Sequence, residues 1–125
     1  VSYQRLVALG RQPVLVDVLN RVIRDEAIHF HFYFHEAKAR LADRRTARIA
    51  RFFIDRLWAP VGAGVRPKGE LRTVIGTMYA GADGLAAARR IDATIRQLPG
   101  FEDVALFEAW TRRNVDAAVL GWPAH

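Results

Sequence analysis

The sequence contains no cysteine, and this absence excludes a disulfide scaffold, a zinc–thiolate centre, an iron–sulfur cluster and a thiol nucleophile. It also lacks any apolar run of about 18 residues, so no membrane-spanning helix is expected. The first residues do not combine a basic region with a long apolar core, as a signal peptide would. We therefore expect a cytoplasmic protein.

Lysine is scarce: 17 of the 19 basic residues are arginine, and the net charge is +6. Such a balance favours an acidic partner, although an arginine-rich surface on an ordinary soluble protein gives the same composition. With 125 residues, 51% hydrophobic and 26% charged, the chain has the size and composition of one folded domain spanning residues 1–125.

No segment alternates apolar and polar residues with a period of two, so no strand is expected. Apolar residues instead recur at helical spacing, and Gly or Pro separates the segments. Residues 61–69, rich in glycine, are expected to form a loop. The sequence thus predicts an all-α fold, with helical segments at 1–9, 13–42, 46–58, 70–80 and 84–98, and a last one within 101–120.

The segment from Pro13 to Ala42 carries the strongest functional signal. On a helix that turns by about 100° per residue, Glu26 and His29 fall inside an apolar stripe and are predicted to face the core. Burial of an ionised carboxylate without a partner is costly, so a metal ion is the leading explanation. An ordinary buried carboxylate and a hydrogen-bonded core histidine are the alternative. The stripe comprises Leu15, Leu19, Val22, Ile23, Phe30, Tyr33, Ala37 and Leu41.

A carboxylate and an imidazole three residues apart lie on one helical face and can reach one ion. This pair suits iron, manganese or zinc better than calcium or magnesium. Asp25 is rotated by about 100° from Glu26, so it can at best hydrogen-bond to a ligand side chain and not bind the ion itself. Tyr33, one turn after His29, is interpreted as a core aromatic or a redox-active neighbour. His31 and His35 are predicted to face solvent or a partner.

The motif Arg24-Asp25-Glu26-x-x-His29-Phe30-x-Phe32-Tyr33 resembles the fourth bundle helix of ferritin-like di-iron carboxylate proteins. Among these it is most similar to soluble acyl-carrier-protein desaturases and their actinobacterial relatives, over residues 1–42. The resemblance implies a four-helix bundle around two iron ions, with manganese as the alternative metal. Glu26 would be a carboxylate ligand, terminal or bridging, and His29 a terminal imidazole ligand.

The sequence departs from this family because no second Glu-x-x-His begins at Glu36, Glu70, Glu102 or Glu108. The chain is therefore interpreted as the second half of a ferritin-like subunit, lacking the first two helices and the start of the third. Residues 1–42 would be bundle helices with the metal motif, and residues 43–125 shorter C-terminal helices. The di-iron centre would be incomplete in this chain alone.

The resemblance implies a di-iron, O₂-dependent oxidoreductase that desaturates or hydroxylates an acyl chain on a carrier protein. An acidic acyl carrier protein would bind the arginine-rich segment Arg44, Arg45, Arg48 and Arg51, an external donor would supply electrons, and the subunit would form a homodimer. Two alternatives stay open. One is a ferritin-like protein acting in metal handling or oxidative stress. The other is a basic helical module for nucleic acid, for which no recognition motif is evident.

Overall fold

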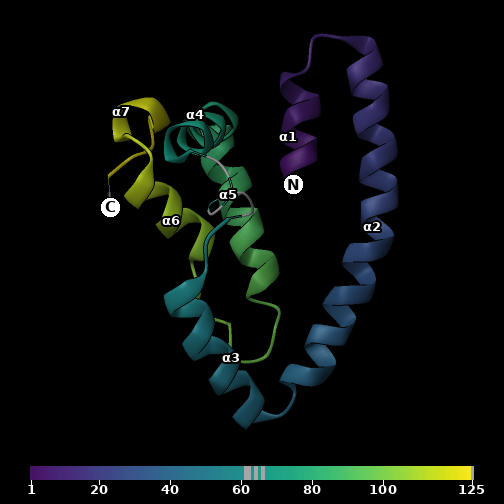
Figure 1. Ribbon diagram of the computed structural model, residues 1–125, viewed down its shortest axis with the longest axis vertical. Helices are drawn as coiled ribbons and strands as arrows, with labels where there is room; N and C mark the ends of the chain where they lie inside the picture. Colours follow the sequence, from purple (N-terminus) through teal and green to yellow (C-terminus); the bar gives the residue numbers. More distant parts are fainter. Residues whose placement is uncertain (61–62, 64, 66, 125) are drawn as a thin grey trace.

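The structure, a computed structural model, describes residues 1–60, 63, 65 and 67–124. This part of the chain is helical and contains no strand (Figure 1), which confirms the predicted all-α class. The helices are α1 (Ser2–Leu9), α2 (Pro13–Leu41), α3 (Arg44–Leu57), α4 (Lys68–Tyr79), α5 (Gly81–Ile95), α6 (Leu106–Asn114) and α7 (Ala117–Leu120).

Helices α1 and α2 form a long hairpin, and α4 to α7 form a compact group beside it (Figure 1). The short α1 lies along the first part of α2, and α3 returns from the far end of α2 toward the group formed by α4 to α7. With 29 residues, α2 is about 43 Å long at 1.5 Å per residue. It is therefore much longer than any helix that packs against it.

Local sequence signals fix the ends of several helices. Pro13 occupies the first turn of α2, where its missing N–H is no loss. Asp43 caps α3, because its carboxylate accepts hydrogen bonds from the Thr46 backbone N–H (2.8 Å) and hydroxyl (2.7 Å). Gly121 ends α7 in the left-handed conformation, with φ of 60°.

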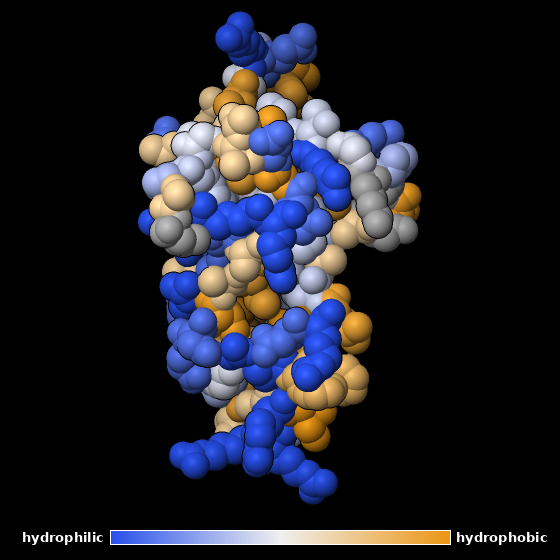
Figure 2. Space-filling view, turned by 90° about the vertical axis from the view of Figure 1, so that its left-hand side faces the viewer, coloured by the Kyte–Doolittle hydropathy of each residue, from blue (hydrophilic) through white to orange (hydrophobic). Residues whose placement is uncertain are grey.

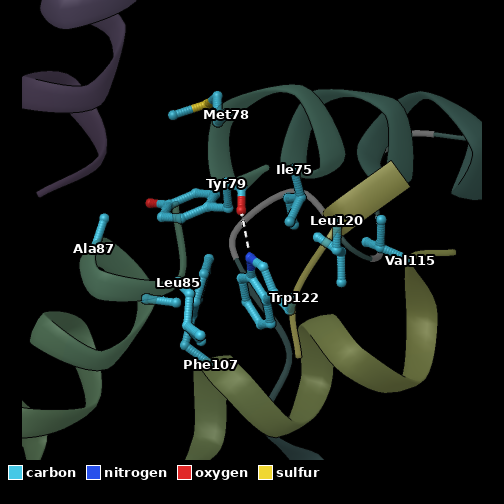
Figure 3. Close-up of a cluster of buried hydrophobic side chains, with 10 residues drawn as sticks. Ile75, Met78, Tyr79, Leu85, Ala87, Phe107, Val115, Leu120 and Trp122 are labelled. Atoms are coloured by element: carbon cyan, nitrogen blue, oxygen red, sulfur yellow. Dashed lines mark hydrogen bonds between the residues drawn. The ribbon is translucent and has the colours of Figure 1, made fainter. Parts of the chain in front are cut away.

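The hydrophobic core lies among α4 to α7 and the residues that follow (Figure 3). At its centre the Trp122 indole N–H donates a 2.8 Å hydrogen bond to the carbonyl oxygen of Tyr79, which satisfies two buried polar groups at once. The Tyr79 ring also packs against Phe107, with centroids 4.7 Å apart. The core cluster comprises Ile75, Met78, Tyr79, Leu85, Ala87, Ala88, Phe107, Val115, Leu120 and Trp122.

The first half of the chain contributes little to this core. Of residues 1–60, all of which the structure describes, only Leu19 and Ala47 are buried. Of the apolar stripe of α2, only Leu19 is buried, Leu15, Phe30 and Tyr33 are exposed, and the other four residues are half-buried. The expectation that this stripe faces the core is therefore wrong for Leu15, Phe30 and Tyr33.

Polar contacts attach α1 and α3 to the compact group. From α1, the Ser2 hydroxyl lies 2.8 Å from the Tyr79 hydroxyl, and Arg5 Nε donates to the Met78 carbonyl oxygen at 2.9 Å. From α3, Arg51 donates to Asp103 Oδ1 at 2.6 Å and to the Gly100 carbonyl oxygen at 3.2 Å. These contacts hold the long hairpin against the compact group without burying its apolar side chains.

The last helices differ most from the sequence prediction. The helix expected to begin at Gly84 begins at Gly81, whose φ of 71° allows α5 to follow α4 directly. The last helix is divided, because Val115 is extended and Asp116 accepts a 2.8 Å hydrogen bond from the Ala118 N–H and so starts α7. Both differences follow from turn geometry that apolar periodicity does not register.

Thr111 is a polar side chain whose loss should be tolerated. It is fully buried, and its hydroxyl has no hydrogen-bond partner among the described residues. Replacing Thr111 by Val keeps the shape and removes an unsatisfied group, so we expect the free energy of unfolding to rise by up to about 1 kcal/mol. Urea denaturation measures this change. The exposed Thr73→Val is the matched control and should stay within about 0.5 kcal/mol of wild type; a destabilised T111V would contradict the prediction.

Candidate interaction surface

Glu26 and His29, the predicted metal ligands, are both exposed on α2. The expectation that they face the core is wrong for a physical reason. The eight residues of α1 span only about 12 Å, so α1 covers the beginning of α2 and ends before it reaches Glu26. The helical wheel had grouped the two residues correctly with apolar neighbours, but no helix covers that part of the group.

The surrounding residues do not build a metal centre either. Asp25 is exposed, and Tyr33 is 68% exposed rather than a core aromatic. Within the part of the chain that the structure describes, no three His, Asp or Glu side chains lie close enough to hold one ion together. The di-iron centre expected from the motif is therefore not formed there. Binding of iron or manganese by Glu26 and His29 themselves stays a prediction.

The middle of α2 is apolar over a wide arc and yet exposed. Ile28, Phe30, Phe32 and Tyr33 are between 52% and 72% exposed, and at 100° per residue they spread over about 200° of the helical wheel. An apolar arc this wide is normally buried by more than one neighbour. We call these four residues the aromatic segment of α2.

A second apolar face lies on α3. Ile49, Phe52, Phe53 and Leu57 follow helical spacing and are between 51% and 74% exposed. Arg56 lies over the Phe52 ring at 3.7 Å from its centroid and donates to the Phe52 carbonyl oxygen. A cation stacked on an aromatic ring keeps its charge at the edge of an apolar surface.

A hollow of about 680 Å³ lies between the hairpin and the compact group. Its walls are mainly apolar, and Phe30 of the aromatic segment lines it from α2. Leu6 of α1, Val74 of α4 and Ile91 of α5 line it from the other helices. The aromatic segment therefore borders an apolar hollow on one side and open solvent on the others.

Arginines surround the end of the hairpin where α2 turns into α3. Arg44, Arg45 and Arg48 are exposed, and Arg44 and Arg48 line a second hollow of about 590 Å³ together with Arg51. Arg51 is already engaged: hydrogen bonds from its guanidinium to Asp103 and Asp55 raise the pKa of Arg51. Figure 2 shows strongly hydrophilic side chains projecting from this end of the molecule.

The sequence analysis missed a buried polar cluster that joins α5 and α6. Asp92 is fully buried, and its carboxylate accepts hydrogen bonds from the backbone N–H groups of Phe107 (2.9 Å) and Glu108 (3.0 Å). It thus caps the start of α6 from another helix. The only signal in the sequence is a carboxylate at an apolar position, between Ala88 and Ile95.

Glu108 is the charged member of this cluster. Burial by itself raises the pKa of Glu108, but hydrogen bonds from Arg112 (2.9 Å) and Arg89 (3.2 Å) outweigh this effect and hold the pKa below its ordinary value. Arg112 also lies over the Trp122 ring and donates to the Pro123 carbonyl oxygen. The cluster therefore stabilises the core and is not placed to act on a substrate.

The fold and this surface define a helical protein whose first half exposes apolar side chains of the kind that subunit interfaces bury. Comparison with known proteins then identifies a relative. The chain is 41% identical over 75 residues to the urease subunit beta of Blochmanniella pennsylvanica, a match covering 59% of this chain and 70% of the relative. By this sequence identity and coverage, the chain belongs to the family of urease beta subunits. No family model matches the chain, and no solved structure matches it.

This relationship corrects the ferritin-like assignment and the functions drawn from it. The relative is a urease subunit and not a ferritin-like protein, so the di-iron oxidoreductase and the desaturase interpretation are wrong. The two alternatives, a ferritin-like protein in metal handling and a basic nucleic-acid module, are not supported better, and neither is an acyl carrier partner. No helix among the described residues is long and apolar enough to cross a membrane.

Proposed function

We propose that this chain is an assembly subunit of a urease-related enzyme and binds another subunit through the aromatic segment of α2 and the apolar face of α3. The observation that carries the proposal is the exposure of Ile28, Phe30, Phe32 and Tyr33, which spread over about 200° of the helix. The relative's description as a subunit supports the same conclusion, because a subunit functions within a larger assembly.

The charge of the surface suggests what kind of chain covers it. Residues 1–57 span α1, α2 and α3. They include eleven basic and six acidic residues, which gives a net charge of +5. Arg44, Arg45 and Arg48 stand next to the apolar faces and are exposed. A partner with apolar side chains at the centre of its interface and carboxylates at the rim would match this surface. We therefore infer an acidic partner subunit.

The test is whether the chain elutes with a urea-hydrolysing assembly. An extract of the cells that make it is fractionated by size, and the chain is followed with an antibody while ammonia release from urea is measured in each fraction. We expect the chain to elute far above its own mass of 14.1 kDa, together with the activity. Elution at its own mass, or apart from every urea-hydrolysing fraction, would refute the proposal.

Paired substitutions locate the interface. Phe32→Glu combined with Phe53→Glu places a carboxylate on each apolar face, and we expect the assembled fraction to fall at least about tenfold. Val65→Glu is the matched control, because Val65 is also apolar and 90% exposed but lies outside both faces. Equal effects of the two changes would show that the interface lies elsewhere. Circular dichroism verifies that each variant stays helical.

A further inference from the structure

Two histidines of α2 lie on the same stripe of the helix as Ile28. His31 and His35 are one turn apart and exposed, and their Nε2 atoms lie 3.3 Å from each other. Their rings meet edge to face, with centroids 4.7 Å apart. The same ring nitrogen of both side chains is therefore available at one place on the exposed surface of the helix.

That spacing matches what a shared metal ion requires. Zinc binds imidazole nitrogen at about 2.0–2.1 Å in tetrahedral geometry, which separates two ligand nitrogens by about 3.3–3.4 Å. In the structure the Nε2 atoms already have this separation. A direct hydrogen bond between the two rings, with one ring as the neutral donor, is the other arrangement that the distance permits.

We propose that His31 and His35 form a binding site for one divalent transition-metal ion on the outer side of α2. The described residues supply no third His, Asp or Glu to the same ion, so water completes the coordination in the free chain. Arg24 and Lys38 lie on the same stripe of the helix, and their positive charges repel a bound cation. The binding is accordingly weaker than at a site with three or four protein ligands.

The chemistry of the ligands sets the metal preference. Two imidazoles favour copper(II) and zinc, and copper(II) binds the more tightly of the two, while magnesium and calcium require oxygen ligands. This site is separate from Glu26 and His29, whose side chains lie on a different side of α2 by helical spacing. It is also independent of the proposed subunit role, since metal binding is measured on the purified chain by itself.

The experiment is a calorimetric titration of the full chain, without a histidine tag, with Zn²⁺ at pH 7.5. We expect one ion per chain, and a dissociation constant at least about tenfold weaker in His31→Ala and in His35→Ala, because each removes one of two chelating groups. Asn20→Ala is the matched control: it removes another exposed polar side chain of the same helix and should bind as wild type does. Absence of saturable binding to wild type, or equal loss in N20A, overturns the proposal.

Copper(II) provides a second readout, because its spectrum reports the atoms that bind the ion and does not depend on the stability of the fold. Electron paramagnetic resonance of the Cu²⁺-loaded chain should show two coordinating nitrogens in wild type and in N20A, and a single nitrogen in H31A and H35A. All three substitutions are at exposed positions, so circular dichroism should be unchanged. Two nitrogens retained in H31A would mean that the ion is bound elsewhere.

Discussion

Replacing Gly84 by Ala is expected to abolish stable folding. A Cβ atom at this position would lie 2.0 Å from the Tyr79 carbonyl oxygen and 2.1 Å from its carbonyl carbon. These are backbone atoms, so no side-chain rotation relieves the overlap. Tyr79 is itself 2% exposed, and its carbonyl oxygen accepts the Trp122 hydrogen bond. The added methyl group would therefore have to separate α4 from α5 at the centre of the core.

The expected cost is at least about 4 kcal/mol, a large share of the roughly 5–15 kcal/mol that stabilises a domain of ordinary stability. Urea denaturation followed by circular dichroism measures the loss, and the variant should be largely unfolded at 37 °C. Gly69→Ala is the matched control: Gly69 is in α4, and a Cβ there would meet nothing within 4 Å. That change should leave stability equal or raise it by up to about 1 kcal/mol. A G84A protein as stable as wild type would contradict the close approach of the two helices.

The sequence could not have revealed this role of Gly84. Apolar spacing located α5 to within a few residues. Contact between Gly84 and Tyr79 depends on the direction in which α5 leaves α4, which Gly81 determines through its positive φ. Such a turn is specified by three-dimensional packing, and helical periodicity carries no information about it.

The same limit explains the error about Glu26 and His29. A helical wheel shows which side chains share a face, but it does not show whether another element covers that face. Around Leu19, α1 does cover α2, and Leu19 is buried as predicted. Beyond the stretch that α1 covers, none of the described helices buries Phe30 and Tyr33, and both are exposed although they belong to the same apolar stripe. The costly burial that called for a metal ion does not occur.

Arg51 shows the corresponding limit for charged residues. The sequence grouped it with Arg44, Arg45 and Arg48 as a surface for an acidic partner. In the structure its guanidinium donates to Asp103, 52 positions later in the chain, a pairing that no local pattern could have indicated. Of that group, Arg44, Arg45 and Arg48 remain exposed and available to a partner. The prediction of partner-binding residues thus stays open for these three, whereas Arg51 has a structural role.

Glu108→Gln is expected to lower the free energy of unfolding by about 2 kcal/mol at neutral pH. The Glu108 side chain is 10% exposed and pairs with Arg112, which is 20% exposed, and with the more exposed Arg89. Glutamine keeps the size but removes the charge, and it leaves Arg112 partly buried without its counter-ion. A fully buried pair would cost about 3–5 kcal/mol to break, and the exposure of Arg89 reduces this figure.

The pH dependence of this effect distinguishes a lost ion pair from lost packing. Hydrogen bonds from the two arginines hold the folded-state pKa of Glu108 below its ordinary value of 4.5, against the opposing effect of burial. A carboxylate with a lowered folded pKa stabilises the fold above its unfolded pKa, and this contribution disappears as the pH falls through the folded pKa. Wild type and E108Q should therefore differ most above pH 4.5 and converge in stronger acid. Asp17→Asn, which removes one partner of an exposed pair with Arg21, should change stability little at any pH. A difference between wild type and E108Q that stays constant down to the acid limit would assign the effect to packing.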